Sequence, residues 1–292
     1  MAQDLAEPCD VRWGDLRKRV ASAAILAPLA LVAIWFGATA WTVLVTAVTL
    51  GLTFEWVRLC GFRVAAMPGI AVPLAVLVAG AAAVDEHERL ALLLLLAGSL
   101  AAWLIAYADV PHRKGSPGLR TEVRRPVSLA AGIGYVGLAC VAMVWLRHDS
   151  DVGRWNVLFL VLVVWATDVG AYISGRLIGG PRLAPSISPS KTWAGAVGGL
   201  AMAIVFGSLV AHGMGGHASV WRVALVAASL GAIAQSGDLL ESVIKRRFGV
   251  KDSGRLIPGH GGLLDRLDGV LAAAPAAAIL ALALGRGVVL WR

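Results

Sequence analysis

The sequence predicts an all-α, polytopic integral membrane protein with about nine transmembrane helices. Hydrophobic residues make up 58% of the 292 residues, charged residues only 15%, and the mean hydropathy is +0.77, whereas a soluble domain carries about 25% charged residues. Apolar segments of near-spanning length, roughly 20 residues, recur along the chain. Because backbone polar groups in lipid must be paired within the segment, these segments must be helices. No room is left for a separate soluble domain.

Nine segments are apolar enough to be spans, and the breaks between them carry the charges, glycines and prolines. The second is short, so we expect it to tilt little or to enter the interface. The N-terminus is polar through Arg19 and no small-residue cleavage site follows, so we expect the first segment to remain as a span. The expected spans cover residues 20–37, 41–57, 66–84, 90–107, 127–146, 156–174, 192–212, 221–241 and 269–285.

The distribution of basic residues predicts the orientation of these spans. If the N-terminus is cytoplasmic, 20 of the 26 Lys and Arg residues fall in cytoplasmic segments and 6 in the others, as the positive-inside rule requires. We therefore expect an N-in, C-out topology. Short loops and the lack of an organelle signal favour the plasma membrane, the inner membrane of a bacterium. The net charge of +8 suits an anionic membrane face or anionic ligands.

Several glycines are interpreted as packing residues. Gly175 with Gly179, and Gly195 with Gly199, have the four-residue spacing that is typical of closely packed helices. Residues 132–137, GIGYVG, match a dinucleotide-binding fingerprint by letters alone. They follow no strand and lie in an expected span, so we assign them to helix packing as well.

One polar segment, residues 242–268, stands out in this apolar chain. It holds six Lys or Arg, one His and five Gly in 27 positions, so we interpret it as the place where chemistry occurs rather than as a solvated loop. At the end of the preceding span, Asp238, Ser242 and Lys245 fall on one helical face, at i, i+4 and i+7. Glu241 and Lys245 are also four apart, so an ordinary ion pair on the helix surface is the alternative.

The segment ends in two carboxylates at the start of the last span. Asp265 and Asp268 share a face there, and one interpretation is that carboxylates simply favour a helix N-terminus. The other is a metal site, because the two lie beside a third carboxylate and oxygen ligands suit Mg²⁺. His260 is either an acid–base or phosphate-contacting group or a structural residue. The basic side chains are expected to neutralise phosphate oxygens; they are Lys245, Arg246, Arg247, Lys251, Arg255 and Arg266.

A second polar cluster lies upstream, around the sixth expected span. Trp165, Asp168 and Tyr172 stand at i, i+3 and i+7, and Asp168 lies well inside the apolar run, where a carboxylate needs a partner or an ion. The following loop, residues 185–192, contains two prolines, several hydroxyls and a lysine. Two interpretations are open for it: either backbone amides at the helix start bind a phosphate, or Thr192 or Ser190 caps the helix.

Together these residues resemble the signature of phosphatidate cytidylyltransferases, also called CDP-diacylglycerol synthases. The match runs through residues 242–268, SVIKRRFGVKDSGRLIPGHGGLLDRLD, without a departure. It extends upstream to Asp168, Tyr172 and residues 188–193. One departure is Ala194, where many members carry an acidic or amide side chain.

The resemblance implies that CTP and phosphatidic acid give CDP-diacylglycerol and pyrophosphate, with Mg²⁺ as the cofactor, alone or with a second metal ion. Both substrates are polyanionic, which suits the basic segment. It also implies a homodimer in contact with membrane lipid and no nucleic-acid partner. Residues 1–150 are then N-terminal helices with scaffold, lipid-access and candidate dimer roles, similar to the family only in hydropathy and in small touches such as Glu55-Trp56. Residues 151–292 form the catalytic region.

On this resemblance we assign roles to individual residues. The metal ligands are Asp238, Ser242, Asp265 and Asp268, and Lys245 and His260 complete the catalytic set. Substrate contacts are assigned to a larger group of residues: Asp168, Tyr172, Ser188, Lys191, Thr192, Arg246, Lys251, Asp252 and Arg266. The substitution Asp265→Asn is expected to abolish turnover and to leave the protein folded.

A transporter that uses Asp168 and Asp238 as ion-coupling carboxylates is the alternative from another class. The lack of an evident inverted repeat argues against it, as does the gathering of polar residues at one membrane face rather than at the midplane. A nucleotidyltransferase acting on another lipid phosphate is a nearer alternative, because the signature does not separate acyl from ether chains. A Walker-type kinase is unsupported, since the sequence has no G-x-x-x-x-G-K-[ST] motif.

Overall fold

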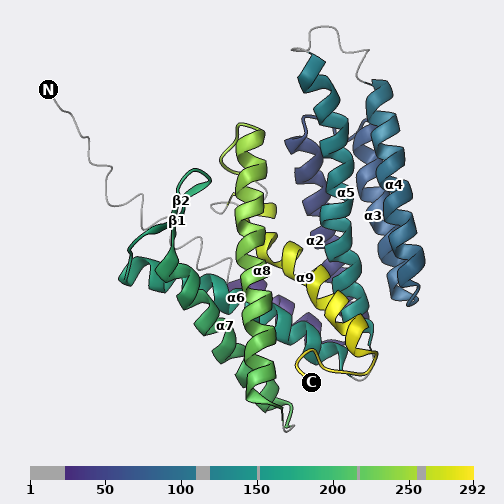
Figure 1. The fold of residues 1–292 in the computed structure, drawn as a ribbon. Helices are drawn as coiled ribbons and strands as arrows, with labels where there is room; N and C mark the ends of the chain where they lie inside the picture. The colour runs from purple at the N-terminus through teal and green to yellow at the C-terminus, as the bar shows by residue number, and fades with distance from the viewer. Residues whose placement is uncertain (1–23, 110–118, 150–151, 216–217, 255–260) are drawn as a thin grey trace, which may run out of the picture.

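The structure is a computed structural model, and it describes residues 24–109, 119–149, 152–215, 218–254 and 261–292 (Figure 1). Within these residues, helices occur at all nine predicted places, and eight of them are long and apolar enough to cross a membrane. The remaining helix, Ala24–Phe36, is shorter. The prediction of an all-α, polytopic membrane protein with about nine helices is confirmed.

The elements follow one another as α2 (Ala38–Leu59), α3 (Met67–Val84), α4 (Glu88–Asp109), α5 (Leu119–His148), α6 (Gly153–Leu177), β1 (Arg182–Ala184), β2 (Ser188–Thr192), α7 (Trp193–Gly213), α8 (Val220–Arg247) and α9 (Leu264–Leu284). The strands β1 and β2 form an antiparallel hairpin between α6 and α7. The sequence had suggested only a loop there.

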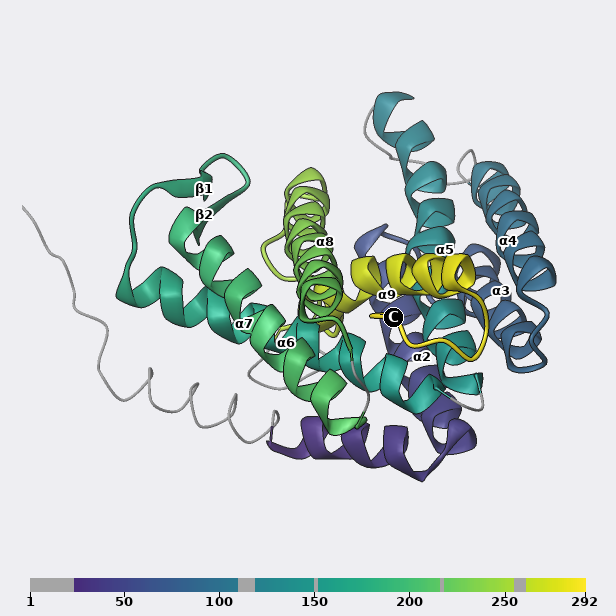
Figure 2. The ribbon, with the colours of Figure 1, turned by 60° about the horizontal axis from the view of Figure 1, so that its bottom comes forward.

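The second predicted span is not short. Helix α2 has 22 residues, because it begins at Ala38 and ends at Leu59, beyond both ends of the expected segment. Glu55 lies within it, and its burial is supported by hydrogen bonds. The short helix is instead Ala24–Phe36, which packs at the connection between α5 and α6. There Arg147 donates to the Ile34 carbonyl at 2.8 and 3.0 Å. Figure 2 shows this helix in purple, and its Trp35 ring contacts Trp155 at the start of α6.

The helices form two groups that meet along α5 and α9. Helices α3, α4 and α5 pack together with α2, whereas α6 and α7 form the most extensive pair and α8 packs on α7 and α9. Helix α9 lies between the groups, against α8 and α5 (Figure 1). The start of α9, with Asp265 and Asp268, is therefore held between the two groups of helices.

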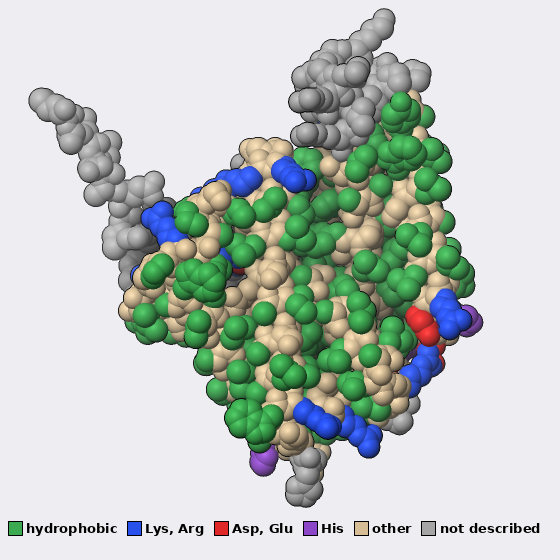
Figure 3. All heavy atoms as spheres, in the orientation of Figure 1, with side chains coloured by type: hydrophobic (Ala, Val, Ile, Leu, Met, Phe, Trp, Pro, Cys, Tyr) green, Lys and Arg blue, Asp and Glu red, His purple; other side chains and the backbone are tan. Residues whose placement is uncertain are grey.

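Polar contacts between the connections gather at two opposite ends of the bundle. At one end, Arg286 after α9 pairs with Glu86 between α3 and α4, and Asp149 after α5 accepts the Gly287 backbone N–H at 2.9 Å. At the other end, Lys191 before α7 pairs with Asp238 of α8. Hydrophobic side chains cover much of the flank between these ends (Figure 3). Connections at two opposite ends, with an apolar flank between them, are what consecutive membrane crossings require.

The predicted glycine packing of α6 on α7 is confirmed for Gly175, Gly195 and Gly199. It is wrong for Gly179, which lies beyond the end of α6 and where a Cβ would meet nothing within 4 Å. A Cβ on Gly195 would lie 2.8 Å from the Ala171 carbonyl oxygen, and one on Gly199 would lie 2.8 Å from the Thr167 carbonyl oxygen. Gly175 faces Gly195 across the same contact. These approaches exclude a side chain, so α6 and α7 can touch along their backbones.

Residues 132–137 also serve packing, and they offer a matched test within α5. A Cβ on Gly132 would lie 1.9 Å from the Trp56 indole nitrogen, whereas a Cβ on Gly134 meets nothing within 4 Å. We expect Gly132→Ala to lower the free energy of unfolding by about 1–3 kcal/mol through overpacking, and Gly134→Ala to leave it unchanged or to raise it slightly. Thermal unfolding in detergent measures both. Equal losses of stability for the two variants would contradict the packing interpretation.

Candidate functional site

A polar pocket of about 740 Å³ opens beside the β1–β2 hairpin, between α6, α7, α8 and α9. Pockets for cofactors and small substrates typically measure about 300–1,000 Å³. Side chains from both predicted polar clusters meet in it, although they are up to a hundred positions apart in sequence. The charged residues that line it are Asp168, Arg176, Lys191, Asp238, Glu241, Lys245, Asp265, Arg266 and Asp268.

Three carboxylates come together in this pocket, and we call them the carboxylate triad: Asp238, Glu241 and Asp268. The first two stand one turn apart on α8, Asp268 comes from α9, and one oxygen of each lies within 4.8 Å of the other two. The helices approach closely because position 237 is glycine. A Cβ on Gly237 would lie 2.7 Å from the Asp268 carbonyl oxygen.

The carboxylate triad fits a divalent cation. Like charges at this separation repel one another, so the triad needs positive charge beside it. The Oε1 atom of Glu241 is buried and has no hydrogen-bond partner in the described part of the chain, and a bound cation would satisfy it. Sets of oxygen ligands suit hard cations such as Mg²⁺. Sequence reasoning had placed Glu241 only in an ion pair; its i, i+3 spacing from Asp238 was the signal that it belonged to the cluster.

Two lysines flank the carboxylate triad. The Nζ atom of Lys191 lies 2.5 Å from Asp238 Oδ2. The Nζ atom of Lys245 lies 3.2 Å from Glu241 Oε2 and 2.6 Å from Asp265 Oδ1. The i, i+4 ion pair that we set out as an alternative is therefore formed, but it is not a surface pair, because Glu241 is only 3% exposed.

Asp265 stands beside the carboxylate triad rather than in it. Besides the contact with Lys245, its Oδ2 atom accepts the Ser253 and Gly262 backbone N–H groups and the Ser253 hydroxyl, each at 2.9 Å. The turn has no space for a side chain at position 262, where a Cβ would lie 1.9 Å from Ser253 Oγ. Asp265 thus fixes the position of Lys245 and holds the chain before α9 against that helix.

Glu55 of α2 is a buried carboxylate, 3% exposed, to which sequence reasoning gave no role. Its Oε2 atom accepts the backbone N–H of Leu264, the first residue of α9, at 2.9 Å, and the Ser253 hydroxyl at 3.4 Å. A carboxylate at a helix N-terminus is favoured by the helix dipole. Glu55 therefore ties α2 to the helix that carries Asp268. A charged residue inside an apolar segment was the signal available in the sequence.

The upstream cluster forms the opposite wall of the pocket. Asp168, Tyr172 and Arg176 come from α6, and the Tyr172 hydroxyl accepts a hydrogen bond from Arg176 at 2.8 Å. Thr192 caps α7, since its hydroxyl oxygen accepts the Gly195 backbone N–H at 3.1 Å. The capping interpretation of the 185–192 loop is confirmed for Thr192, which also lines the pocket.

Some predicted site residues lie away from this pocket. Ser188 begins β2 opposite Ala184, Ser242 is half-buried on α8, and Arg246 is exposed on the last turn of α8. Lys251 and Asp252 are exposed in the chain that follows. None of these five lines the pocket. Their predicted roles remain predictions, as does that of His260, which lies outside the described residues.

Comparison with known proteins finds a matching family and several similar proteins. Residues 17–284 match a family described as the Cytidylyltransferase family. A phosphatidate cytidylyltransferase of Brucella suis biovar 1 is 37% identical over 260 residues, which cover 89% of this chain and 91% of the relative. A phosphatidate cytidylyltransferase of Staphylococcus haemolyticus is 43% identical over 148 residues, which cover 51% of this chain and 56% of the relative.

The contact between Glu55 and α9 can be tested by substitution. Glu55→Ala leaves the Leu264 N–H without its acceptor, so we expect it to lower the free energy of unfolding by about 1–3 kcal/mol. Glu55→Gln keeps an acceptor oxygen and should lose less. Glu86→Ala, which removes an exposed ion pair with Arg286 at the opposite end, should cost about 0–1 kcal/mol. Thermal unfolding of the three variants gives the order of their losses in stability. A loss of stability for Glu55→Ala no larger than that for Glu86→Ala would refute the capping role of Glu55.

Proposed function

The chain belongs to the cytidylyltransferase family and its function is CDP-diacylglycerol synthesis; on this premise we propose that CTP and phosphatidate react in the polar pocket. The observation that carries the proposal is the carboxylate triad between two lysines. Both substrates carry several negative charges, and the pocket offers carboxylates for a cation together with lysines and arginines for phosphate oxygens.

The reaction transfers a cytidylyl group. A phosphate oxygen of phosphatidate attacks the α-phosphorus of CTP, a new phosphorus–oxygen bond forms, and the bond to pyrophosphate breaks. Such transfers depend mainly on positioning and on neutralising charge. The pocket is suited to this task because its carboxylates and cationic side chains come from three helices, α6, α8 and α9, and from strand β2, which leads into α7.

We assign the cationic side chains to the phosphate groups. Lys191, Lys245 and Arg266 line the pocket, and the two lysines contact the carboxylate triad. Their charges would balance the phosphates of CTP and of the lipid. Asp265 holds Lys245 in place through a 2.6 Å contact. We therefore propose that Asp265 acts on Lys245 and on the chain before α9, and that Glu241 is the third carboxylate of the metal-binding set.

Asp238, Glu241 and Asp268 would hold Mg²⁺. When bound, Mg²⁺ supplies positive charge that stabilises the attacking and leaving oxygens. The side chains of the pocket do the remaining work: they bind the phosphates and orient them in line.

Tyr172 is the residue that we propose for the cytosine ring. Its side chain is 64% exposed at the pocket wall, with the Arg176 guanidinium 6.0 Å from its ring centre. Aromatic side chains stack on bases with little dependence on sequence. Asp168 lies one turn before Tyr172 on the same wall, so the base end of CTP would lie along α6 and its phosphates toward α8 and α9.

For the membrane, we propose the inner membrane of a bacterium, with the N-terminus and the pocket on the cytoplasmic side. The excess of Lys and Arg in alternate connections supports this orientation, which requires the segment that ends at Phe36 to complete the first of nine crossings. CTP would then reach the pocket from the cytoplasm. A homodimer is proposed from the family resemblance.

The proposed function is tested by turnover of the purified protein with labelled CTP and phosphatidic acid, with and without Mg²⁺. We expect a lipid-soluble cytidine label and released pyrophosphate in the presence of Mg²⁺, and neither product after chelation. Transport of an ion into proteoliposomes without consumption of CTP would contradict the proposal and favour a transporter.

The carboxylate triad and Asp265 should respond differently to loss of charge. Asp268→Asn keeps an acceptor for the Gly269 N–H and relieves repulsion within the triad, so we expect unchanged or raised thermal stability in the absence of Mg²⁺. In the presence of Mg²⁺ we expect a fall in kcat of roughly 10²–10³-fold. Asp265→Asn also removes turnover but should lower thermal stability, because it weakens the contacts with Lys245 and Ser253. An equal loss of stability in both variants would show that Asp268 is structural.

A further inference from the structure

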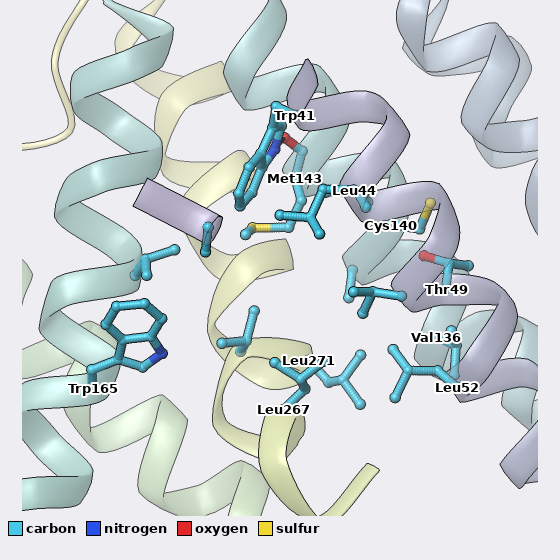
Figure 4. A pocket seen from close by; sticks show the side chains of 16 residues that line it. Trp41, Leu44, Thr49, Leu52, Val136, Cys140, Met143, Trp165, Leu267 and Leu271 are labelled. Carbon is cyan, nitrogen blue, oxygen red and sulfur yellow. Dashed lines mark hydrogen bonds between the residues drawn. The ribbon is translucent and has the colours of Figure 1, made fainter. Parts of the chain in front are cut away.

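A second pocket, of about 120 Å³, lies inside the helix bundle and is almost entirely apolar. Figure 4 shows side chains of α2, α5, α6 and α9 converging on it, among them Trp41, Met143, Trp165 and Leu271. The Trp41 indole nitrogen donates to the Met143 carbonyl oxygen at 3.0 Å, so the ring is fixed as part of the wall. No charged side chain lines the pocket among the described residues.

The apolar pocket and the polar pocket share two helices. On α6, Trp165 lines the apolar pocket and Asp168 lines the polar pocket, and three residues of helix separate their Cα atoms by a rise of about 4.5 Å. On α9, Leu271 lines the apolar pocket and Asp268 lines the polar pocket, again three residues apart. One turn of each helix therefore separates the two environments.

We propose that the apolar pocket binds part of one acyl chain of the phosphatidate whose phosphate reacts in the polar pocket. This inference rests on the proposed function, because it identifies the hydrocarbon as that of the substrate. Nucleotide and phosphate groups do not match an apolar wall, since buried charge needs a partner. Of the two substrates, only phosphatidate has hydrocarbon, and its glycerol joins that hydrocarbon to the reacting phosphate.

The volume of the apolar pocket sets how much of an acyl chain it can hold. An apolar cavity of about 150 Å³ stays dry and binds benzene, so a pocket of about 120 Å³ holds a segment of a few carbons rather than a whole chain. The remainder of that chain and the second chain stay in the bilayer. The expected consequence is a preference for lipids whose chains are long enough to reach and fill this pocket.

The test compares long-chain and short-chain substrates in a variant with a filled pocket. Ala139 of α5 lines the pocket and is 3% exposed, so Ala139→Leu occupies part of the space. We expect kcat/KM for dioleoyl phosphatidate to fall roughly tenfold relative to that for dihexanoyl phosphatidate, as for a misfit of a few methylenes. Ala101→Leu is the matched control, because Ala101 is exposed on α4, and it should leave the ratio unchanged.

An unchanged ratio in Ala139→Leu would overturn the proposal, even if both activities fall together.

A second measurement uses the unaltered protein and phosphatidate that carries a photoreactive diazirine on an acyl chain. We expect label on peptides of α2 and α5 that line the pocket, removed by excess phosphatidate but not by phosphatidylcholine. Label confined to α3 and α4 would refute acyl binding. Inactivity of the wild-type protein toward both chain lengths would instead refute the proposed function, and the labelling would still report on acyl binding.

Discussion

The close approach of three carboxylates between α8 and α9 is the constraint on which the rest of the site depends. Asp238, Glu241 and Asp268 bring an oxygen each within 4.8 Å of one another, an arrangement that costs free energy unless positive charge lies beside it. Lys191 and Lys245 supply part of that charge from two different elements. Among the described residues one Glu241 oxygen has no hydrogen-bond partner, so a bound cation would satisfy it. The repulsion among the three carboxylates is what would favour a divalent cation there, as proposed for Mg²⁺.

Keeping these carboxylates together requires that α9 begin at one fixed place. Two acidic side chains secure its first turn from opposite directions. Glu55, from α2, accepts the Leu264 N–H. Asp265, on α9 itself, pairs with Lys245 and accepts the Ser253 backbone N–H. The N-terminal helices therefore contribute directly to the geometry of the site. Beyond the scaffold, lipid-access and dimer roles expected of residues 1–150, α2 thus accepts a hydrogen bond from the first residue of α9, beside the polar pocket.

An enzyme that works on a lipid phosphate has to receive a charged group and hydrocarbon within a short distance. Here α6 and α9 each place a polar residue and an apolar residue one turn apart, facing different pockets. The polar pocket suits phosphates because its wall is charged, and the apolar pocket suits an acyl chain because none of the described side chains that line it is charged.

The sequence by itself determined the membrane helices, the basic segment and the family signature, because hydropathy and short-range spacing are properties of consecutive residues. The i, i+4 pair of Glu241 and Lys245 and the cap at Thr192 could be predicted for the same reason. Only the tertiary structure decided that Glu241 joins Asp238 and Asp268 while Asp265 turns toward Lys245 and Ser253. It also decided that Glu55 reaches α9 across 209 positions. Such contacts depend on how helices cross. Helices α8 and α9 can cross closely at Gly237 because glycine has no side chain, and no local sequence pattern connects Gly237 with Asp268.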